Sequence, residues 1–172
     1  MYSAFSSCDN LSSVQLPSTL TEIQNSAFYS CYALREVNFP EGLTTIGDFA
    51  FSAYTSYLTE ITLPSTLTQI GEHAFSYNHG LTELTIPGSI SEITGFAFFS
   101  CTTLKHITVE EGVQTIDEYA FASCNALETV SLPASVSSID ETAFESAGAF
   151  SISAPEGSYA YDWAQSRGLL AE

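Results

Sequence analysis

The chain has 172 residues, of which 45% are hydrophobic, and it carries three Lys and Arg against 20 Asp and Glu, a formal net charge of -17. This balance argues against nucleic-acid binding, because phosphates are neutralised by a basic footprint, and it disfavours anionic membrane surfaces for the same reason. No apolar run approaches the roughly 18 residues that would indicate a membrane-spanning helix, so we expect no membrane insertion. A basic protein partner, a neutral glycan or a divalent cation is compatible with the charge.

The dipeptide Ala-Phe recurs throughout the chain, and successive phenylalanines lie 23 or 24 residues apart. The phenylalanines are Phe5, Phe28, Phe51, Phe75, Phe98, Phe121 and Phe144. Self-similarity at this period is typical of a stacked array rather than of a single rounded core. We therefore expect one continuous column of buried phenylalanines, in which each ring covers the next.

Residues 1–10 contain only the end of a repeat, "SAFSSC", with neither a basic n-region nor an apolar signal sequence before it. Because the ends of stacked arrays need polar caps, we expect this partial repeat to continue a longer protein. Six full repeats follow in residues 11–152. They begin at Leu11, Leu34, Leu58, Leu81, Leu104 and Leu127.

Three residues after its first leucine, each full repeat has two apolar residues spaced two apart, which predicts a short strand with one buried face. These pairs are Val14/Leu16, Val37/Phe39, Ile61/Leu63, Leu84/Ile86, Ile107/Val109 and Val130/Leu132. A proline usually ends the strand, although Glu110 replaces it once. Ala-Phe then predicts a tight helical or 3₁₀ turn with both side chains inward. One repeat has an extra residue within Ser52 to Tyr57, which we place in a loop.

Residues 153–172 depart from the repeat and predict a C-terminal cap. Ser158 is a suitable N-cap, Arg167 falls in the last turn, and Gly168 is a suitable stop for a short helix. We expect Trp163 to cover the open end of the core, because single aromatic residues are mostly buried.

The repeat, exemplified by "LTEITLPSTLTQIGEHAFSYN" (58–78), resembles the leucine-rich repeat superfamily in its BspA-like form. Like that form, it lacks the asparagine of the classical leucine-rich unit. The resemblance implies a mainly β, right-handed solenoid of 23-residue repeats, with a parallel sheet on one side. It also implies an extracellular or cell-surface location and adhesion to proteins of a host or a neighbouring cell.

Two sets of outward residues are candidate binding sites. The first set lies on the predicted sheet face and is either a solvated surface or a ligand-contacting one; it comprises Glu36, Asn38, Glu60, Thr62, Glu83, Thr85, His106 and Thr108. Within it, Glu83 and His106 are expected to form an ion pair. The second set flanks Ala-Phe and is either an exposed aromatic edge patch or packing between repeats; it comprises Tyr29, Phe49, Phe96, Phe99 and Tyr119.

An acidic column also precedes Ala-Phe, and we interpret it as solvated charge because it lacks calcium-loop spacing. It contains Asp48, Glu72, Glu118 and Glu141, with Asp117 and Asp140 alongside. The four cysteines, Cys8, Cys31, Cys101 and Cys124, share one repeat position. Buried reduced thiols suit them best, and disulfides are the alternative.

The sequence contains no catalytic motif, no cofactor motif and no metal-ligand set. We therefore favour a non-catalytic interaction or adhesion module that binds a protein or a neutral glycan through its extended face. A structural spacer is the alternative, and a carbohydrate-active β-helix enzyme is a weaker one, because the role-based criteria for an active site are not met.

Overall fold

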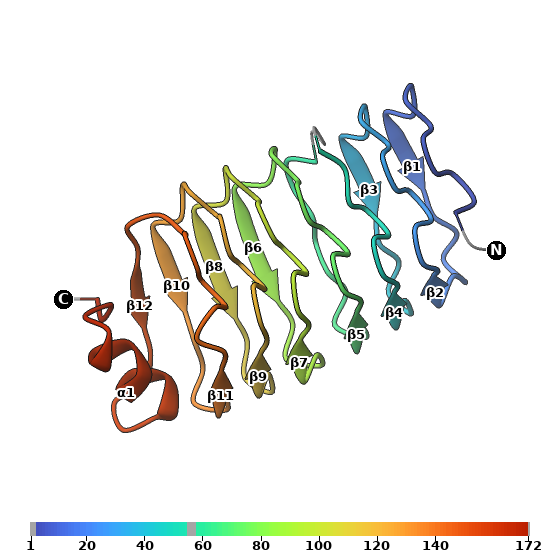
Figure 1. The fold of residues 1–172 in the computed structure, drawn as a ribbon. Coiled ribbons are helices and arrows are strands. Elements are labelled where there is room, and N and C mark those ends of the chain that lie inside the picture. Colours follow the sequence, from blue (N-terminus) through green and yellow to red (C-terminus); the bar gives the residue numbers. More distant parts are fainter. Residues whose placement is uncertain (1–2, 55–57, 172) are drawn as a thin grey trace.

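The computed structural model describes residues 3–54 and 58–171, which form twelve strands and one helix. Successive turns of the chain lie side by side in one elongated stack, with the helix at the C-terminal end (Figure 1). The predicted solenoid of repeats about 23 residues long is confirmed. No helix in the described ranges is long and apolar enough to span a bilayer.

One side of the stack carries the longer strands that the period-two pattern predicts. They are β1 (Ser13–Gln15), β3 (Glu36–Asn38), β6 (Glu83–Ile86), β8 (His106–Val109), β10 (Thr129–Ser131) and β12 (Ser151–Ser153). All pair in parallel, one repeat apart, so that Leu84 lies opposite Ile107. They form two sheets, β1-β3 and β6-β8-β10-β12, with a break between β3 and β6 (Figure 1).

The other side carries six two-residue strands that the sequence analysis did not resolve as strands. They are β2 (Glu22–Ile23), β4 (Thr45–Ile46), β5 (Gln69–Ile70), β7 (Glu92–Ile93), β9 (Thr115–Ile116) and β11 (Ser138–Ile139). They form two further parallel sheets, β2-β4-β5 and β7-β9-β11. The isoleucine of each strand is buried.

The Ala-Phe segments form consecutive turns rather than a helix. In the second of these segments the amides alternate between two kinds of partner. The amide of Phe28 donates across the stack to the carbonyl of Ala50 at 2.8 Å, whereas the amide of Ala27 donates within its own turn to Gln24 at 3.2 Å. Both side chains are buried, as predicted. The alternation gives every second amide a partner in the next repeat, so the turns also hold the stack together.

The phenylalanine column is continuous along the stack. Neighbouring rings have centroids 5.1 to 5.5 Å apart and interplanar angles of 1° to 15°. Phe98, in the middle, is fully buried, whereas Phe5, at the N-terminal end, is 49% exposed. The predicted column of stacked aromatic rings is confirmed.

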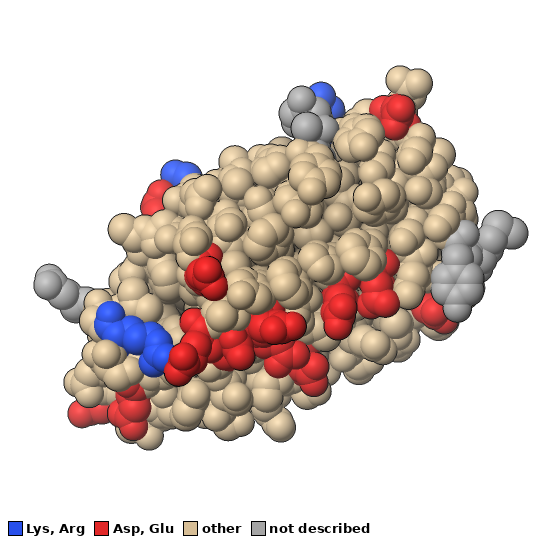
Figure 2. Space-filling model, viewed as in Figure 1, with Lys and Arg blue, Asp and Glu red and all other residues tan. Residues whose placement is uncertain are grey.

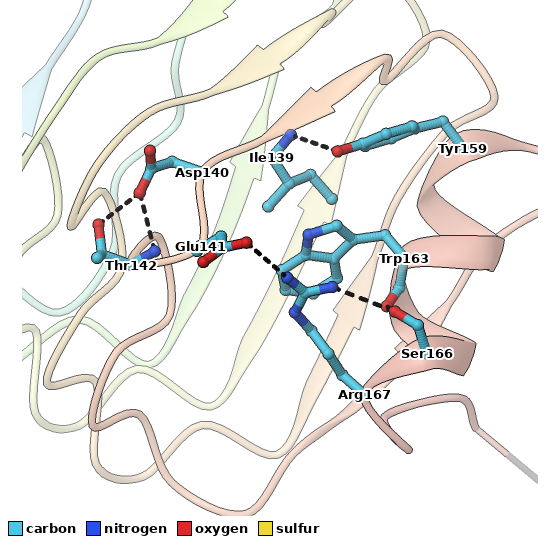
Figure 3. Close-up of polar contacts among 8 residues, drawn as sticks. All are labelled: Ile139, Asp140, Glu141, Thr142, Tyr159, Trp163, Ser166 and Arg167. Carbon is cyan, nitrogen blue, oxygen red and sulfur yellow. Dashed lines mark hydrogen bonds and ion pairs between the residues drawn. The ribbon is translucent and has the colours of Figure 1, made fainter.

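The helix α1 (Tyr159–Ser166) covers the C-terminal end of that column. The Ser158 hydroxyl accepts from the amide of Tyr161 at 3.2 Å, and Gly168 follows the helix with a φ of +68°. Trp163 is buried, with its ring 6.1 Å from that of Phe144. These features confirm the predicted cap and its tryptophan. Figure 3 shows Trp163 on this helix.

Candidate functional site

All eight residues predicted for the sheet face lie on that face, six of them on strands and two, Glu60 and Thr62, in a segment without a strand. Glu83 lies opposite His106 in the β6–β8 pair, and Thr85 lies opposite Thr108. All eight are exposed except His106, which is half-buried. Within each of the two sheets, alternation along the strands places the outward residues in two columns, because paired strands are in register.

The predicted ion pair between Glu83 and His106 is not present in the structure and is corrected. The Nδ1 atom of His106 lies instead 2.9 Å from the hydroxyl of Thr129, its neighbour on the other side in β10. The ion pair of this region joins Lys105 to Glu128, at 3.0 Å. Strand register brings both Glu83 and Thr129 next to the ring, and a hydrogen bond to the short hydroxyl side chain is the contact that forms.

The strand predicted at Ile61 and Leu63 does not form, and this too is a correction. Residues 59–63 belong to no strand, and their amides donate to no backbone carbonyl of the described residues. Glu60 and Thr62 therefore lie on the sheet face without joining the hydrogen-bonded ladder. The loop with the extra residue lies partly outside the described residues, which omit 55–57.

A bulky side chain explains the break in the sheet. Phe39 occupies a position that holds Leu, Ile or Val in the other repeats. Its ring stands edge-on to two rings of the core column, at 5.5 Å from Phe51 and 6.3 Å from Phe75. Because interiors are close-packed, we infer that this larger ring acts as a wedge that holds the two turns apart on the strand side.

The break opens a cleft of about 590 Å³ between β3 and residues 59–62. Arg35, Glu36, Asn38, Glu60 and Thr62 contribute to its lining. Two smaller hollows, of about 310 and 270 Å³, continue it toward β6, and Thr62 lines all three. The main cleft has the size of a ligand site, and its polar lining suits hydrogen-bonding groups such as protein side chains or sugar hydroxyls.

A second candidate site is a ladder of rings beside the Ala-Phe turns. Phe49 stacks on His73 at 4.7 Å, His73 on Phe96 at 4.6 Å, and Phe96 on Tyr119 at 4.8 Å. Phe49 is 39% exposed, and the other three are half-buried. His73 was not predicted as a member of this patch, although its repeat position, directly before Ala-Phe, is the same as that of Phe49.

The remaining predicted aromatic residues join this ladder. Tyr29 meets Phe49 edge-on at 6.5 Å, and Phe99 lies 5.7 Å from Phe96. The structure thus brings all five residues of the predicted patch into one cluster. We call this cluster the aromatic surface; it consists of Tyr29, Phe49, His73, Phe96, Phe99 and Tyr119.

Two further tyrosines border the aromatic surface. Tyr54 stacks on Tyr77 at 4.1 Å, and Tyr77 meets Phe99 edge-on at 5.5 Å. A hydrogen bond with Tyr54, together with burial, raises the pKa of Tyr77 to about 12. Burial also lowers the pKa of His73, with the nearby Glu72 carboxylate acting in the opposite direction. His73 is therefore neutral at pH 7, which suits stacking between two phenylalanines.

Three members of the acidic column border the ladder, because each directly precedes a ladder residue in sequence. We call Asp48, Glu72 and Glu118 the acidic stripe. The Asp48 carboxylate accepts from the amide of Glu72 at 3.1 Å, so it also links two turns of the backbone. Acidic side chains gather in a band along the short-strand side of the stack in Figure 2.

A shallow hollow of about 280 Å³ lies in this acidic band. It is lined by Glu72, Gly95, Asp117, Glu118 and Asp140. Burial, followed by a hydrogen bond with Glu92, raises the pKa of Asp117 to about 6. Within the described residues, no group of three or more His, Cys, Asp or Glu is placed to hold a metal ion.

The cysteines are free thiols rather than disulfides. Cys31, Cys101 and Cys124 are buried, and Cys8 is half-buried. The thiol of Cys31 lies 3.0 Å from the carbonyl of Phe5, and that of Cys101 lies 3.3 Å from the carbonyl of Phe75. The thiols thus contact carbonyls of the previous turn, and they fill the core as small side chains.

The stacked turns, parallel strands and capping helix together define a leucine-rich repeat solenoid. The model of the family described as "BspA type Leucine rich repeat region" matches residues 1–125 and 53–160, with six copies of the repeat. The chain belongs to this BspA-type leucine-rich repeat family. A search of curated proteins found no match.

Two solved bacterial structures resemble this chain in both fold and sequence. A leucine-rich repeat protein from Bacteroides ovatus is 30% identical, with a TM-score of 0.76 over 84% of this chain and 37% of its own. The T. pallidum leucine rich repeat protein (TpLRR) is also 30% identical, with a TM-score of 0.73 over 81% of this chain and 65% of its own. This chain therefore spans less than two thirds of either protein.

A third structure, a leucine-rich repeat protein from Eubacterium ventriosum, shares the fold alone. It is 21% identical, with a TM-score of 0.72 over 82% of this chain and 44% of its own.

Proposed function

We propose that this chain is a non-catalytic binding module that recognises a protein through its sheet face, centred on the cleft beside β3. The observation that carries this proposal is the cleft itself, in which outward residues of two repeats surround a polar hollow. An unbroken sheet would offer only a flat surface. The break lets side chains of a partner enter between Glu36 and Glu60, where they can be enclosed on both sides.

The chemistry of the cleft favours a polar partner surface with basic groups. Glu36, Glu41 and Glu60 contribute carboxylates, and Arg35 contributes the one basic side chain of the lining. Asn38 and Thr62 add groups that both donate and accept hydrogen bonds. A neutral glycan, whose hydroxyls match such groups, is the other ligand class that this lining would accept.

We propose further that the protein is displayed at a microbial cell surface and serves adhesion. The support is membership of the BspA-type family and the net charge of -17, which keeps the repeat array soluble and disfavours contact with anionic membranes. An extended solenoid also suits recognition of large partners, because its stacked repeats create one continuous surface.

The test is an array that carries extracellular proteins and neutral glycans, probed with the unmodified chain and with two variants. The sheet-face variant combines Glu36→Gln, Glu60→Gln and Glu83→Gln. The control variant makes the same charge change at exposed carboxylates away from that face, with Glu22→Gln, Glu145→Gln and Glu156→Gln.

We expect the sheet-face variant to lose the proteins that the unmodified chain captures and the control variant to keep them. Equal binding by all three chains would remove the sheet face as the site. Capture of nothing on the array would instead favour the structural spacer. A reducing-end assay on acidic glycans tests the enzyme alternative, and release of sugar ends would contradict a non-catalytic role.

A further inference from the structure

The aromatic surface and the acidic stripe run side by side along the stack. Asp48 precedes Phe49, Glu72 precedes His73, and Glu118 precedes Tyr119. The rings of the ladder are 4.6 to 4.8 Å apart, so each turn adds a ring and, in three of the four turns, a carboxylate beside it. This surface lies beside the Ala-Phe turns rather than on the sheet face, so it is independent of the proposed function.

The fold does not require rings at these positions. Ser26 and Thr142 occupy the same repeat position in other turns. Phe49, His73, Phe96 and Tyr119 all have left-handed backbone, with φ from 54° to 58°, and Ser26 has a φ of 57°. Left-handed backbone is unfavourable for bulky side chains. Half-exposed rings that the backbone disfavours indicate a purpose other than folding.

Stacking determines which part of each ring a partner can reach. The faces of His73 and Phe96 are covered by their neighbours in the ladder, so the exposed groups are ring edges. Long basic side chains fit such a surface, because their methylene stems pack on apolar atoms while their charged ends extend to a polar neighbour. Here that neighbour is the carboxylate of Glu72 or Glu118, both exposed.

A related contact, made through a ring face rather than ring edges, occurs within the chain. At the C-terminal end of the acidic column, the guanidinium carbon of Arg167, the C-cap of α1, lies 4.1 Å from the ring centroid of Trp163, and a guanidinium nitrogen lies 3.9 Å from a carboxylate oxygen of Glu141 (Figure 3). An arginine thus lies between an aromatic ring and a member of this column. Within the described residues, no basic side chain makes such a contact with the acidic stripe, because Lys105 pairs with Glu128 and Arg35 lines the sheet-face cleft.

We propose that the aromatic surface, with its acidic stripe, is a docking site for a basic segment of a partner protein. Arginine or lysine stems of the segment lie across the ring edges of Phe49, His73 and Phe96. Their charged ends bond to Glu72 and Glu118, which the neighbouring turns place beside the rings.

The test measures binding of an oligo-arginine peptide at physiological salt, with an oligo-glutamate peptide as the opposite probe. The aromatic variant combines Phe49→Ser and Phe96→Ser, which install the residue that Ser26 shows this backbone accepts. The carboxylate variant combines Glu72→Gln and Glu118→Gln. The control variant, Glu22→Gln with Glu156→Gln, makes the same charge change at exposed carboxylates outside both the sheet face and the aromatic surface.

We expect the oligo-arginine peptide to bind the aromatic variant and the carboxylate variant about tenfold more weakly than the unmodified chain, and the control variant with unchanged affinity. Equal weakening in the carboxylate and control variants would show attraction to net charge alone and overturn the proposal. Unchanged binding by the aromatic variant would overturn the part played by the rings. Binding of oligo-glutamate with equal affinity would overturn the basic character of the partner.

A second measurement on the unmodified chain keeps the test independent of any effect of the substitutions on folding. The ring protons of His73, in the centre of the ladder, are followed by NMR during titration with oligo-arginine. We expect these signals to shift with the same affinity as the binding curve. Signals that stay unchanged at saturation would place the peptide elsewhere and overturn the proposal.

Discussion

Truncation of one core phenylalanine, Phe98→Ala, is expected to be strongly destabilising. The ring of Phe98 is fully buried and is stacked between Phe75 at 5.4 Å and Phe121 at 5.5 Å. Truncating a buried phenylalanine costs about 3 to 5 kcal/mol, of which each stacked pair contributes about 0.5 to 1.5 kcal/mol. Because turns of a solenoid contact only their neighbours, the loss falls on the two adjacent turns and weakens the middle of the stack.

The same column offers a matched control in Phe5→Ala. Phe5 is 49% exposed and stacks on one ring only, that of Phe28. Half of the apolar burial and one stacked contact correspond to about 1 to 3 kcal/mol. The assay is urea denaturation followed by circular dichroism, which gives the free energy of unfolding of each variant. Equal losses for Phe98→Ala and Phe5→Ala would refute the continuous buried column, since position in the stack would then not matter.

Three further predictions follow from the wedge, the acidic band and the thiols. Phe39→Leu should close the sheet break, and hydrogen exchange should show amides 60–62 exchanging about tenfold more slowly; unchanged rates would refute the wedge. The pKa of Asp117 is raised from 3.8 to about 6, because the folded state disfavours its charged form. The contribution of Asp117 to the free energy of unfolding should therefore be lost as pH rises from about 4 to about 6. Melting temperatures across this pH range should show that Asp117→Asn removes this loss, and the same slope in the variant would exclude Asp117 as its source. An alkylating reagent should label Cys8 in the folded chain well before Cys124, whose pKa burial raises to about 12, and mass spectrometry showing equal rates would contradict a buried thiol.

Much of the fold was predictable because it depends on a pattern repeated at one period. A single repeat has too few apolar residues to close a core, so recurrence of Ala-Phe every 23 or 24 residues already requires stacked turns. The cap was predictable for a local reason, since Ser158 and Gly168 are recognisable helix boundaries. The outward direction of Glu83 and Thr85 likewise followed from alternation along a strand.

Most members of the candidate sites were predictable, but His73 and the contacts between the members were not. Periodicity placed Phe49 and Phe96 at equivalent positions, and the structure joins them in one surface. The periodicity did not reveal that the ring of His73 lies between them, because a histidine in a loop is ordinarily a solvated residue. The ion pair expected between Glu83 and His106 failed for a similar reason, since register gives His106 two neighbours and only packing selects between them.

The sequence by itself determined the stack of turns, its aromatic column and its helical cap, because each depends on spacing along the chain. Only the tertiary structure decided that the sheet breaks beside β3. Phe39 satisfies the apolar pattern as well as leucine does, and its consequence arises from ring volume against Phe51 in its own turn and Phe75 in the next. The periodic pattern of apolar residues predicts which side chains face inward. The space available to each side chain depends on neighbours that lie more than 10 residues away in the sequence.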